Sequence, residues 1–541
     1  MNFIDNPTTL LGREKALTLL AKRIHDFKEG YRQNIALIGE ELSGKTSLLK
    51  HFIKNLHESH LVTVYIEVIA FEHNHFLRNL LRAILFNFIK TKTFLKDDSL
   101  DYLIASAEEI IPGSIDLVKK IKQNIEKGKI TEAYREIIDL PDLLSKETNQ
   151  WCVIIIDNFH NLEELKITNP YQELGKRIMS QKKCMYIVAS SSIFKAKEIL
   201  TEKLALLFGN FEIIEIGLFN VEQSLSFVNV EFEGLQIEES YKKFIVDFTS
   251  GHPFYLTIVC SKLKNILESN NVRGVSLGIL ISCFEELLFY KWGILNQYFS
   301  NYLNRISLGK NNYIFISILL ALVNGNNKIN EISTALHQKK EDVSIKMNRL
   351  LEQNLLSRNG SFYYISSKLF RFWIKHVFHS RLATINHDSQ YQLNAFRNSV
   401  KKEIDNFIDA DKIDAFERVF ELFNLFHNES VQLNGHKYRL SHLKDVRRFS
   451  LDENKKWAIA DSMSALWFIL LNDKDCKEED VINFLSECRK HKGKPQRRIV
   501  VSLNGIEANA KLRALGEKMW VWSAKEINAL LNLYNKPFII K

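Results

Sequence analysis

The eight residues from Gly39 to Thr46 combine glycines, a lysine and a hydroxyl in the order GxxxxGK[ST]. Glycines let backbone N–H groups curl around a phosphate, Lys45 places a positive charge on the outer phosphate oxygens, and the Thr46 hydroxyl can ligate Mg²⁺. A tight turn that needs glycines is the structural alternative. The pattern predicts a P-loop whose ATP-binding residues are Gly39, Ser43, Gly44, Lys45, Thr46 and Ser47.

Asp157 directly follows the apolar run from Trp151 to Ile156, and its carboxylate could ligate a metal ion. Because the phosphate site needs a second acidic group, we expect Thr46 and Asp157 to hold Mg²⁺ together, with an ordinary buried strand meeting a turn as the alternative. The next catalytic position is Asn158, whose amide can orient water but cannot accept its proton. Loss of a general base typically costs roughly 10²- to 10⁴-fold in rate.

Two further sets of polar residues follow along the chain. Glu163 and Glu164 follow Asn158, and they are either a replacement base or part of a solvated helix face. Another apolar run ends in hydroxyls at Ser190 to Ser192. We expect Ser190 to sense the γ-phosphate at the sheet edge, while a serine-rich helix cap would explain the same residues.

The elements that position these residues alternate between strands and helices, which predicts an α/β fold with a parallel sheet covered on both faces. A long helical segment at 74–149, broken at Pro112-Gly113 and at Pro141, precedes the third strand. The expected strands are Asn34–Ile38, Val62–Val68, Val153–Ile156, Met185–Ala189 and Phe211–Ile216.

Four further segments follow the predicted 1–219 P-loop domain. Helical signals over 220–305 predict a helical lid, and 306–378 has the pattern of a winged helix-turn-helix, with helix, short helix, helix and hairpin. In its third helix, Lys346 and Arg349 lie away from the apolar side. The segment 379–400 has no strong period and is predicted as a connector, and 401–541 as a small α/β domain.

The composition sets outer limits on these predictions. The 541 residues exceed one ordinary domain, and 7 prolines with 21 glycines leave little room for disorder. The net charge of +9 permits nucleic acid without demanding it. The longest apolar run, Tyr313 to Val323, is shorter than a membrane span, and the N-terminus lacks a signal-peptide pattern, so we expect a cytoplasmic protein without a membrane partner.

Taken together, these motifs resemble the archaeal-type P-loop ATPases of the STAND and AAA+ group over roughly residues 8 to 378. The resemblance includes Leu11-Gly12-Arg13-Glu14 and Gly251-His252-Pro253. It implies that Arg13 lies by the adenine and that Gly251 and Pro253 lie near the base, although a helix-breaking turn would also explain the latter pair.

The chain departs from this family at two positions, and both weaken the case for fast hydrolysis. Asn158 stands where many members have glutamate. Phe208-Gly209-Asn210 stands where many members have Gly-Arg, which removes a candidate arginine finger.

The region 401–541 resembles the restriction-endonuclease-like fold often attached to such ATPases. An active PD-(D/E)xK site needs an Asp, a Glu and a nearby Lys around Mg²⁺. Leu470 and Asn472 stand at the Glu and Lys positions, and Asp461 remains as a single acidic residue. The resemblance therefore implies a degenerate domain without nuclease activity.

The sequence thus predicts an ATP- and Mg²⁺-binding switch with slow ATPase activity, in which nucleotide sets the position of the winged helix and C-terminal domain. Double-stranded DNA is one possible partner through Lys346 and Arg349; regulatory packing of the winged helix on its own nucleotide domain is the other interpretation. The alternative function is a non-hydrolysing nucleotide-binding scaffold that recruits a protein partner. The partner could also be a second copy of this chain.

Overall fold

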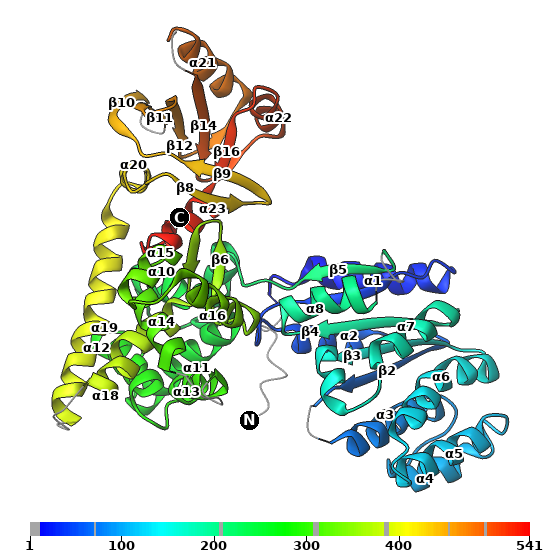
Figure 1. The fold of residues 1–541 in the computed structure, drawn as a ribbon. Coiled ribbons are helices and arrows are strands. Elements are labelled where there is room, and N and C mark those ends of the chain that lie inside the picture. The colour runs from blue at the N-terminus through cyan, green and yellow to red at the C-terminus, as the bar shows by residue number, and fades with distance from the viewer. Residues whose placement is uncertain are drawn as a thin grey trace. The chain divides into compact units, whose positions relative to one another are not determined.

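The computed structural model describes residues 11–69, 72–204, 209–306, 313–383, 389–452, 455–491 and 495–540 (Figure 1). The chain forms two compact units, Met1–Phe219 and Asn220–Lys541.

Five strands of the first unit form one parallel sheet in the order β2-β3-β4-β1-β5. Each predicted strand is found within two residues of its expected bounds, so the predicted α/β class with a parallel sheet is confirmed. The strands are β1 (Asn34–Ile38), β2 (Leu61–Glu67), β3 (Trp151–Asp157), β4 (Cys184–Ser190) and β5 (Phe211–Glu215).

Helices cover both faces of this sheet. Successive side chains of each strand point to opposite faces, so alternate residues pack against different helices. Ile35 and Leu37 of β1 pack with α1 (Glu14–Lys28) and α2 (Lys45–Asn55). Ala36 and Ile38 of the same strand belong to the core on the other face. The helices contributing to that core are α3 (His73–Ile89), α4 (Leu100–Ala107), α5 (Ile115–Glu126), α6 (Ile130–Thr148), α7 (Pro170–Ser180) and α8 (Ile193–Glu198).

The helical insertion before β3 has the predicted break at Pro112-Gly113, between α4 and α5, but the break predicted at Pro141 is wrong. Helix α6 continues through Pro141 to Thr148. A proline inside a helix removes one backbone hydrogen bond. Buried Ile137, Leu140 and Leu144 anchor both sides of the proline to the core, and this packing outweighs the local loss.

The second unit begins with helices and has no named strand among its described residues up to 306. The role of this part as a lid stays a prediction. Its helices are α9 (Val221–Glu231), α10 (Glu239–Thr249), α11 (Pro253–Ser269), α12 (Leu277–Phe284), the π-helical turn η5 (Glu285–Phe289) and α13 (Ile294–Ile306).

The next part has the predicted order of helix, short helix, helix and hairpin, while its assignment as a winged helix stays a prediction. Val343, Met347 and Leu350 are buried, and Arg349 is exposed. The elements are α14 (Tyr313–Val323), α15 (Ile329–Ala335), α16 (Lys340–Glu352), β6 (Ser357–Asn359), β7 (Phe362–Tyr364), α17 (Lys368–Trp373) and the π-helical turn η6 (Ile374–Phe378).

The segment predicted as a connector is helical in its described part. It contains α18 (His379–Ala383) and the first half of α19 (Ser389–Lys412), a helix 24 residues long; residues 384–388 lie outside the described ranges. Phe396, Val400, Ile404 and Phe407 recur at helical spacing and are buried. Tertiary packing on this thin apolar stripe stabilises a helix that the polar surroundings of the sequence obscured.

The last part is a small α/β domain around a mixed sheet in the order β10-β11-β12-β14-β16. β10, β11 and β12 are antiparallel, whereas β12, β14 and β16 are parallel. Its likeness to a nuclease fold stays a prediction. The elements are α20 (Ala415–Asn424), β8 (Glu429–Leu433), β9 (His436–Leu440), β10 (Lys444–Asp452), β11 (Lys455–Asp461), β12 (Leu466–Asn472), β13 (Asp475–Cys476), α21 (Glu478–Arg489), β14 (Gln496–Ser502), β15 (Gly505–Ile506), α22 (Ala508–Gly516), β16 (Trp520–Ser523) and α23 (Ala524–Leu533).

Candidate nucleotide-binding site

The loop between β1 and α2 needs its glycines for two different reasons. A Cβ added to Gly39 would lie 2.2 Å from the carbonyl oxygen of Ile216, so no larger residue fits there without movement of the backbone. Gly44 has a φ of 94°, in the left-handed region that glycine adopts without strain. Helix α2 begins at Lys45, and its N-terminus leaves backbone N–H groups free to bind an anion.

The Lys45 side chain is 4% exposed and binds oxygens of its own loop. Its Nζ donates to the carbonyl oxygens of Gly39 at 3.1 Å and Glu40 at 2.7 Å, and to Ser43 Oγ at 3.3 Å. Burial lowers the pKa of the Lys45 ammonium to about 8, because lost hydration outweighs the attraction of nearby carboxylates. An anion in this loop would stabilise the charged form, so the site is electrostatically suited to a phosphate.

Two hydroxyl groups converge on Asp157, which ends β3 and is 1% exposed. Thr46 Oγ1 donates to Asp157 Oδ2 at 2.6 Å, and the hydroxyl of Tyr65 donates to the same oxygen at 3.1 Å. Burial and the Asp157 charge raise the pKa of Tyr65, so this phenol stays a donor. The structure therefore brings together the two residues expected to share a metal ion.

Asn158 contacts a carboxylate from the neighbouring strand. Its Nδ2 donates to Glu67 Oε1 at 3.2 Å, and its Oδ1 accepts from Ser191 Oγ at 3.5 Å. Glu67 ends β2 and stands beside Asp157 in the parallel register. Asn158 itself has a φ of 53°, in the left-handed region that asparagine tolerates better than most residues. A carboxylate thus lies next to the position where the sequence offered only an amide.

The two glutamates that follow in the chain are held by lysines. Glu163 and Glu164 lie in the 3₁₀ turn η2 (Phe159–Leu165), where Glu163 pairs with Lys203 and Glu164 pairs with Lys195 at 3.6 Å. These surface ion pairs match the alternative of a solvated helix face rather than a replacement base.

Ser190 lies at the end of β4 beside the P-loop, and its backbone oxygen accepts from the Gly39 N–H at 3.2 Å. Its fully buried hydroxyl contacts His160 Nδ1 and the backbone oxygen of Ser192, each at 3.0 Å. The sensor role of Ser190 stays a prediction. Its neighbour Ser191 is the serine whose hydroxyl contacts Asn158.

Arg13 links three parts of the first unit. Its guanidinium donates to the carbonyl oxygens of Ser43 and Gly217, both at 2.8 Å, and lies 4.9 Å from the ring centroid of Phe219. These contacts support the backbone of the P-loop. Proximity of Arg13 to an adenine base stays a prediction.

The remaining predicted site residues make none of the contacts described above. Ser47 is exposed in the first turn of α2. Gly251, with a φ of 69°, and Pro253, the first residue of α11, belong to the second unit, and their role at the nucleotide stays a prediction. Phe208, from the position of the missing arginine finger, lies outside the described residues.

Sequence reasoning missed Tyr65 and Glu67. The alternation in β2 contained a signal, since Thr63, Tyr65 and Glu67 interrupt an otherwise apolar strand at every second residue. That pattern places the three on one face, but only the strand order β2-β3 brings them beside Asp157.

In the C-terminal domain, the positions compared with a nuclease site are embedded in β12. Leu470 is buried, and Asn472 Nδ2 contacts Asp480 Oδ2 at 3.3 Å. Asp461 stands opposite Lys444 in the β10–β11 register. Across the described ranges, no group of three or more His, Cys, Asp or Glu side chains is arranged to hold a metal ion.

Comparison with known proteins agrees with the P-loop geometry. Residues 10–259 match the model of a family described as an ATPase domain predominantly from Archaea. The match covers less than half of the chain, and within this segment it supports a nucleotide-binding ATPase domain of archaeal type. The chain matches no curated protein.

Several solved structures are also similar to this chain. A Walker-type ATPase of Pyrococcus abyssi is 14% identical with a TM-score of 0.45, over 69% of this chain and 100% of that one. The ORC2 protein of Aeropyrum pernix, with ADPNP and ADP, is 10% identical with a TM-score of 0.45, over 69% and 95%. The ORC1 protein of Aeropyrum pernix in complex with DNA is 14% identical with a TM-score of 0.38, over 70% and 95%.

None of the helices in the described ranges combines the length and the hydrophobicity needed to span a bilayer.

Proposed function

We propose that the chain is a slow Mg²⁺-dependent ATPase whose nucleotide state acts as a switch. The observation that carries this proposal is the 2.6 Å contact between Thr46 Oγ1 and Asp157 Oδ2, directly beside the buried Lys45. Three groups with the chemistry of nucleotide binding therefore meet at one sheet edge: a phosphate loop, a cation and an oxygen-rich pair.

The Thr46–Asp157 pair suits Mg²⁺ by its donor atoms. This ion prefers oxygen ligands and is held in phosphate-transferring enzymes by one or two side chains together with phosphate oxygens and water. When bound, Mg²⁺ would neutralise charge on the phosphates. Lys45 would bind the β and γ oxygens in place of its present contacts with the loop.

The slow rate follows from how this site treats the attacking water. Asn158 orients a water molecule through its amide, and Glu67, which the same amide contacts at 3.2 Å, accepts the proton. Glu67 is exposed and comes from the adjacent strand rather than from the residue after Asp157. A base in this offset position is expected to be less effective than a carboxylate at residue 158.

Nucleotide titration tests the binding half of this proposal. The Lys45→Ala and Asp157→Asn variants should weaken Mg-ATP binding measured with a fluorescent nucleotide analogue. Lys22→Ala, an exposed lysine on α1, is the matched control and should bind as the native chain does. Equal affinity in Lys45→Ala and the native chain would contradict the P-loop assignment.

The second candidate function is a non-hydrolysing nucleotide-bound scaffold that recruits a protein partner. The amide at Asn158 favours this candidate, because no carboxylate directly follows Asp157. Turnover separates the two: the scaffold binds Mg-ATP without releasing phosphate.

DNA is the partner we propose for the α14–α16 region, through Lys346 and Arg349 of α16. The hairpin β6–β7 contacts β8 rather than being free to contact DNA, since the backbone N–H of Ser361 donates to the Ser430 carbonyl oxygen at 2.9 Å. Gly360 approaches the same carbonyl so closely that a Cβ would lie 1.9 Å from it. The turn of this hairpin is thus packed on β8, and α16 is the element left to contact phosphates.

A further inference from the structure

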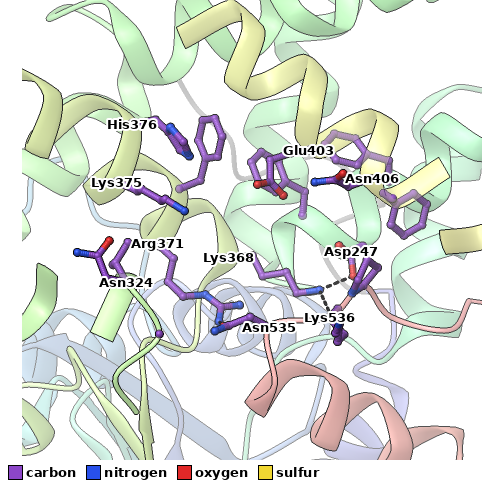
Figure 2. A pocket seen from close by; sticks show the side chains of 17 residues that line it. Asp247, Asn324, Lys368, Arg371, Lys375, His376, Glu403, Asn406, Asn535 and Lys536 are labelled. Carbon is purple, nitrogen blue, oxygen red and sulfur yellow. Dashed lines mark hydrogen bonds and ion pairs between the residues drawn. The ribbon is translucent and has the colours of Figure 1, made fainter. Parts of the chain in front are cut away.

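A cavity of about 440 Å³ lies within the second unit, between its helices and the segment that follows α23. This volume falls in the range of small-molecule sites. Figure 2 shows polar side chains reaching it from α10, α17, η6, α19 and residues 535–536. Parts of the chain almost 300 residues apart in sequence therefore build one site, since Asp247 and Lys536 both line it.

Cations dominate the charged lining of this cavity. One pair is neutralised internally, because Asp247 Oδ1 accepts from Lys368 Nζ at 2.5 Å and from the Phe538 N–H at 2.7 Å. Three positive side chains and one carboxylate remain after this pair is set aside, which leaves a formal excess of two positive charges. The remaining charged residues are Arg371, Lys375, Lys536 and Glu403.

The balance of charge in the cavity favours an anionic guest. The Arg371 guanidinium donates to two neutral amides, Asn535 Oδ1 and, at 3.0 Å, Asn532 Oδ1. Lys375 and Lys536 are exposed and can turn toward a guest. Glu403 is the single opposing carboxyl group, and burial raises its pKa.

Aromatic rings complete the lining. Phe244, Phe248, Phe372 and Phe407 all border the cavity, and each is at least nine-tenths buried. Phe248 and Phe372 contact each other edge to face, with ring centroids 5.3 Å apart. A guest here would meet both a cationic region and an apolar wall, the combination that recognises a charged group on an organic body.

We propose that this cavity binds a small organic phosphate monoester. Such a ligand carries up to two negative charges, which match the excess of positive charge, and its organic body would lie against the phenylalanines. Because Arg371 belongs to α17 and Lys536 to the segment after α23, binding would fasten the C-terminal segment to the helices of the same unit. The site is separate in sequence from the P-loop and does not depend on the ATPase proposal.

Calorimetric titration of the full chain with two probes tests this inference. The titrated protein carries Lys45→Ala, which suppresses phosphate binding at the P-loop. We expect 4-nitrophenyl phosphate to bind at one saturable site and to bind more tightly than inorganic phosphate, because only the former has an aromatic body. Lys375→Gln with Lys536→Gln should weaken binding roughly 3- to 30-fold, as two partly exposed ion pairs are lost.

Two further variants make the test specific, one that should strengthen ligand binding and one that should leave it unchanged. Glu403→Gln should strengthen binding by roughly two- to fivefold, since it removes the opposing carboxylate. Lys511→Gln, an exposed lysine on α22, is the matched control and should change nothing. Melting temperatures without ligand establish that each variant is folded.

Three results would overturn the proposal. The first is no saturable binding at millimolar probe, and the second is native affinity in the folded Lys375→Gln, Lys536→Gln variant. The third is equal affinity for inorganic phosphate and 4-nitrophenyl phosphate, which would exclude recognition of an organic body.

Discussion

Replacing Asn158 by glutamate places a carboxylate directly after Asp157 and tests how the site handles the proton of the attacking water. A positioned general base contributes roughly 10²- to 10⁴-fold in rate, or about 3 to 5 kcal/mol. The new carboxylate would stand near Glu67, which now lies 3.2 Å from the Asn158 amide nitrogen. Two carboxylates at that separation repel by about 1 kcal/mol in water. The expected net gain in kcat is roughly tenfold or more.

The assay measures phosphate release and nucleotide affinity in four proteins: native, Asn158→Glu, Glu67→Gln and the double variant. Glu67→Gln keeps the size of the side chain and should lower the native rate by about 10²-fold if Glu67 is the base. In the Asn158→Glu background the same change should cost little or raise the rate, because the new carboxylate takes over and the repulsion is gone. Nucleotide affinity should hardly change.

The reasoning is refuted if Glu67→Gln and Asn158→Glu both leave the rate unchanged. It is also refuted if Glu163→Gln or Glu164→Gln abolishes turnover, because the base would then lie in the turn after β3. An ordinary enzymatic rate in the native protein, with no gain from Asn158→Glu, would require the slow-switch interpretation to be abandoned.

Three other predictions concern the proposed metal ligand Thr46, the charged residues of α16 and the C-terminal domain. Thr46→Ala should weaken Mg-ATP binding, and excess EDTA should remove the difference from the native chain; a difference that persists in EDTA would mean that Thr46 does not act through the metal. Lys346→Glu with Arg349→Glu should lower DNA affinity and its salt dependence in gel shifts, whereas unchanged binding would move the DNA contact away from α16. Purified protein with Mg²⁺ or Mn²⁺ should not cut DNA, and metal-dependent cleavage that disappears in Asp461→Ala would contradict the degenerate-nuclease interpretation.

Local patterns were enough to predict the elements around the P-loop. The run Asn34–Ile38 and the glycines after it are contiguous, and the apolar strand before Asp157 is equally local. Such features are set by neighbours in sequence, so the strands were found within two residues.

Features that depend on packing could not be read in the same way. Glu67 meets Asn158 only because β2 pairs with β3, a pairing that the sequence does not specify. The helix through Pro141 and the helix α19 are held by tertiary contacts that outweigh a local helix breaker and a polar composition. The cavity proposed to bind a phosphate monoester is lined by both Asp247 and Lys536, and no local sequence motif marks it.

Single-turnover hydrolysis of ATP labelled at the γ-phosphate, with enzyme in excess over nucleotide and Mg²⁺ present, tests the central claim most directly. A slow ATPase switch should bind the nucleotide and release all of the labelled phosphate at a rate well below about 1 s⁻¹, and Lys45→Ala should abolish the release. Binding without any release over many hours would contradict this account and favour the scaffold, and failure to bind would contradict the P-loop site itself.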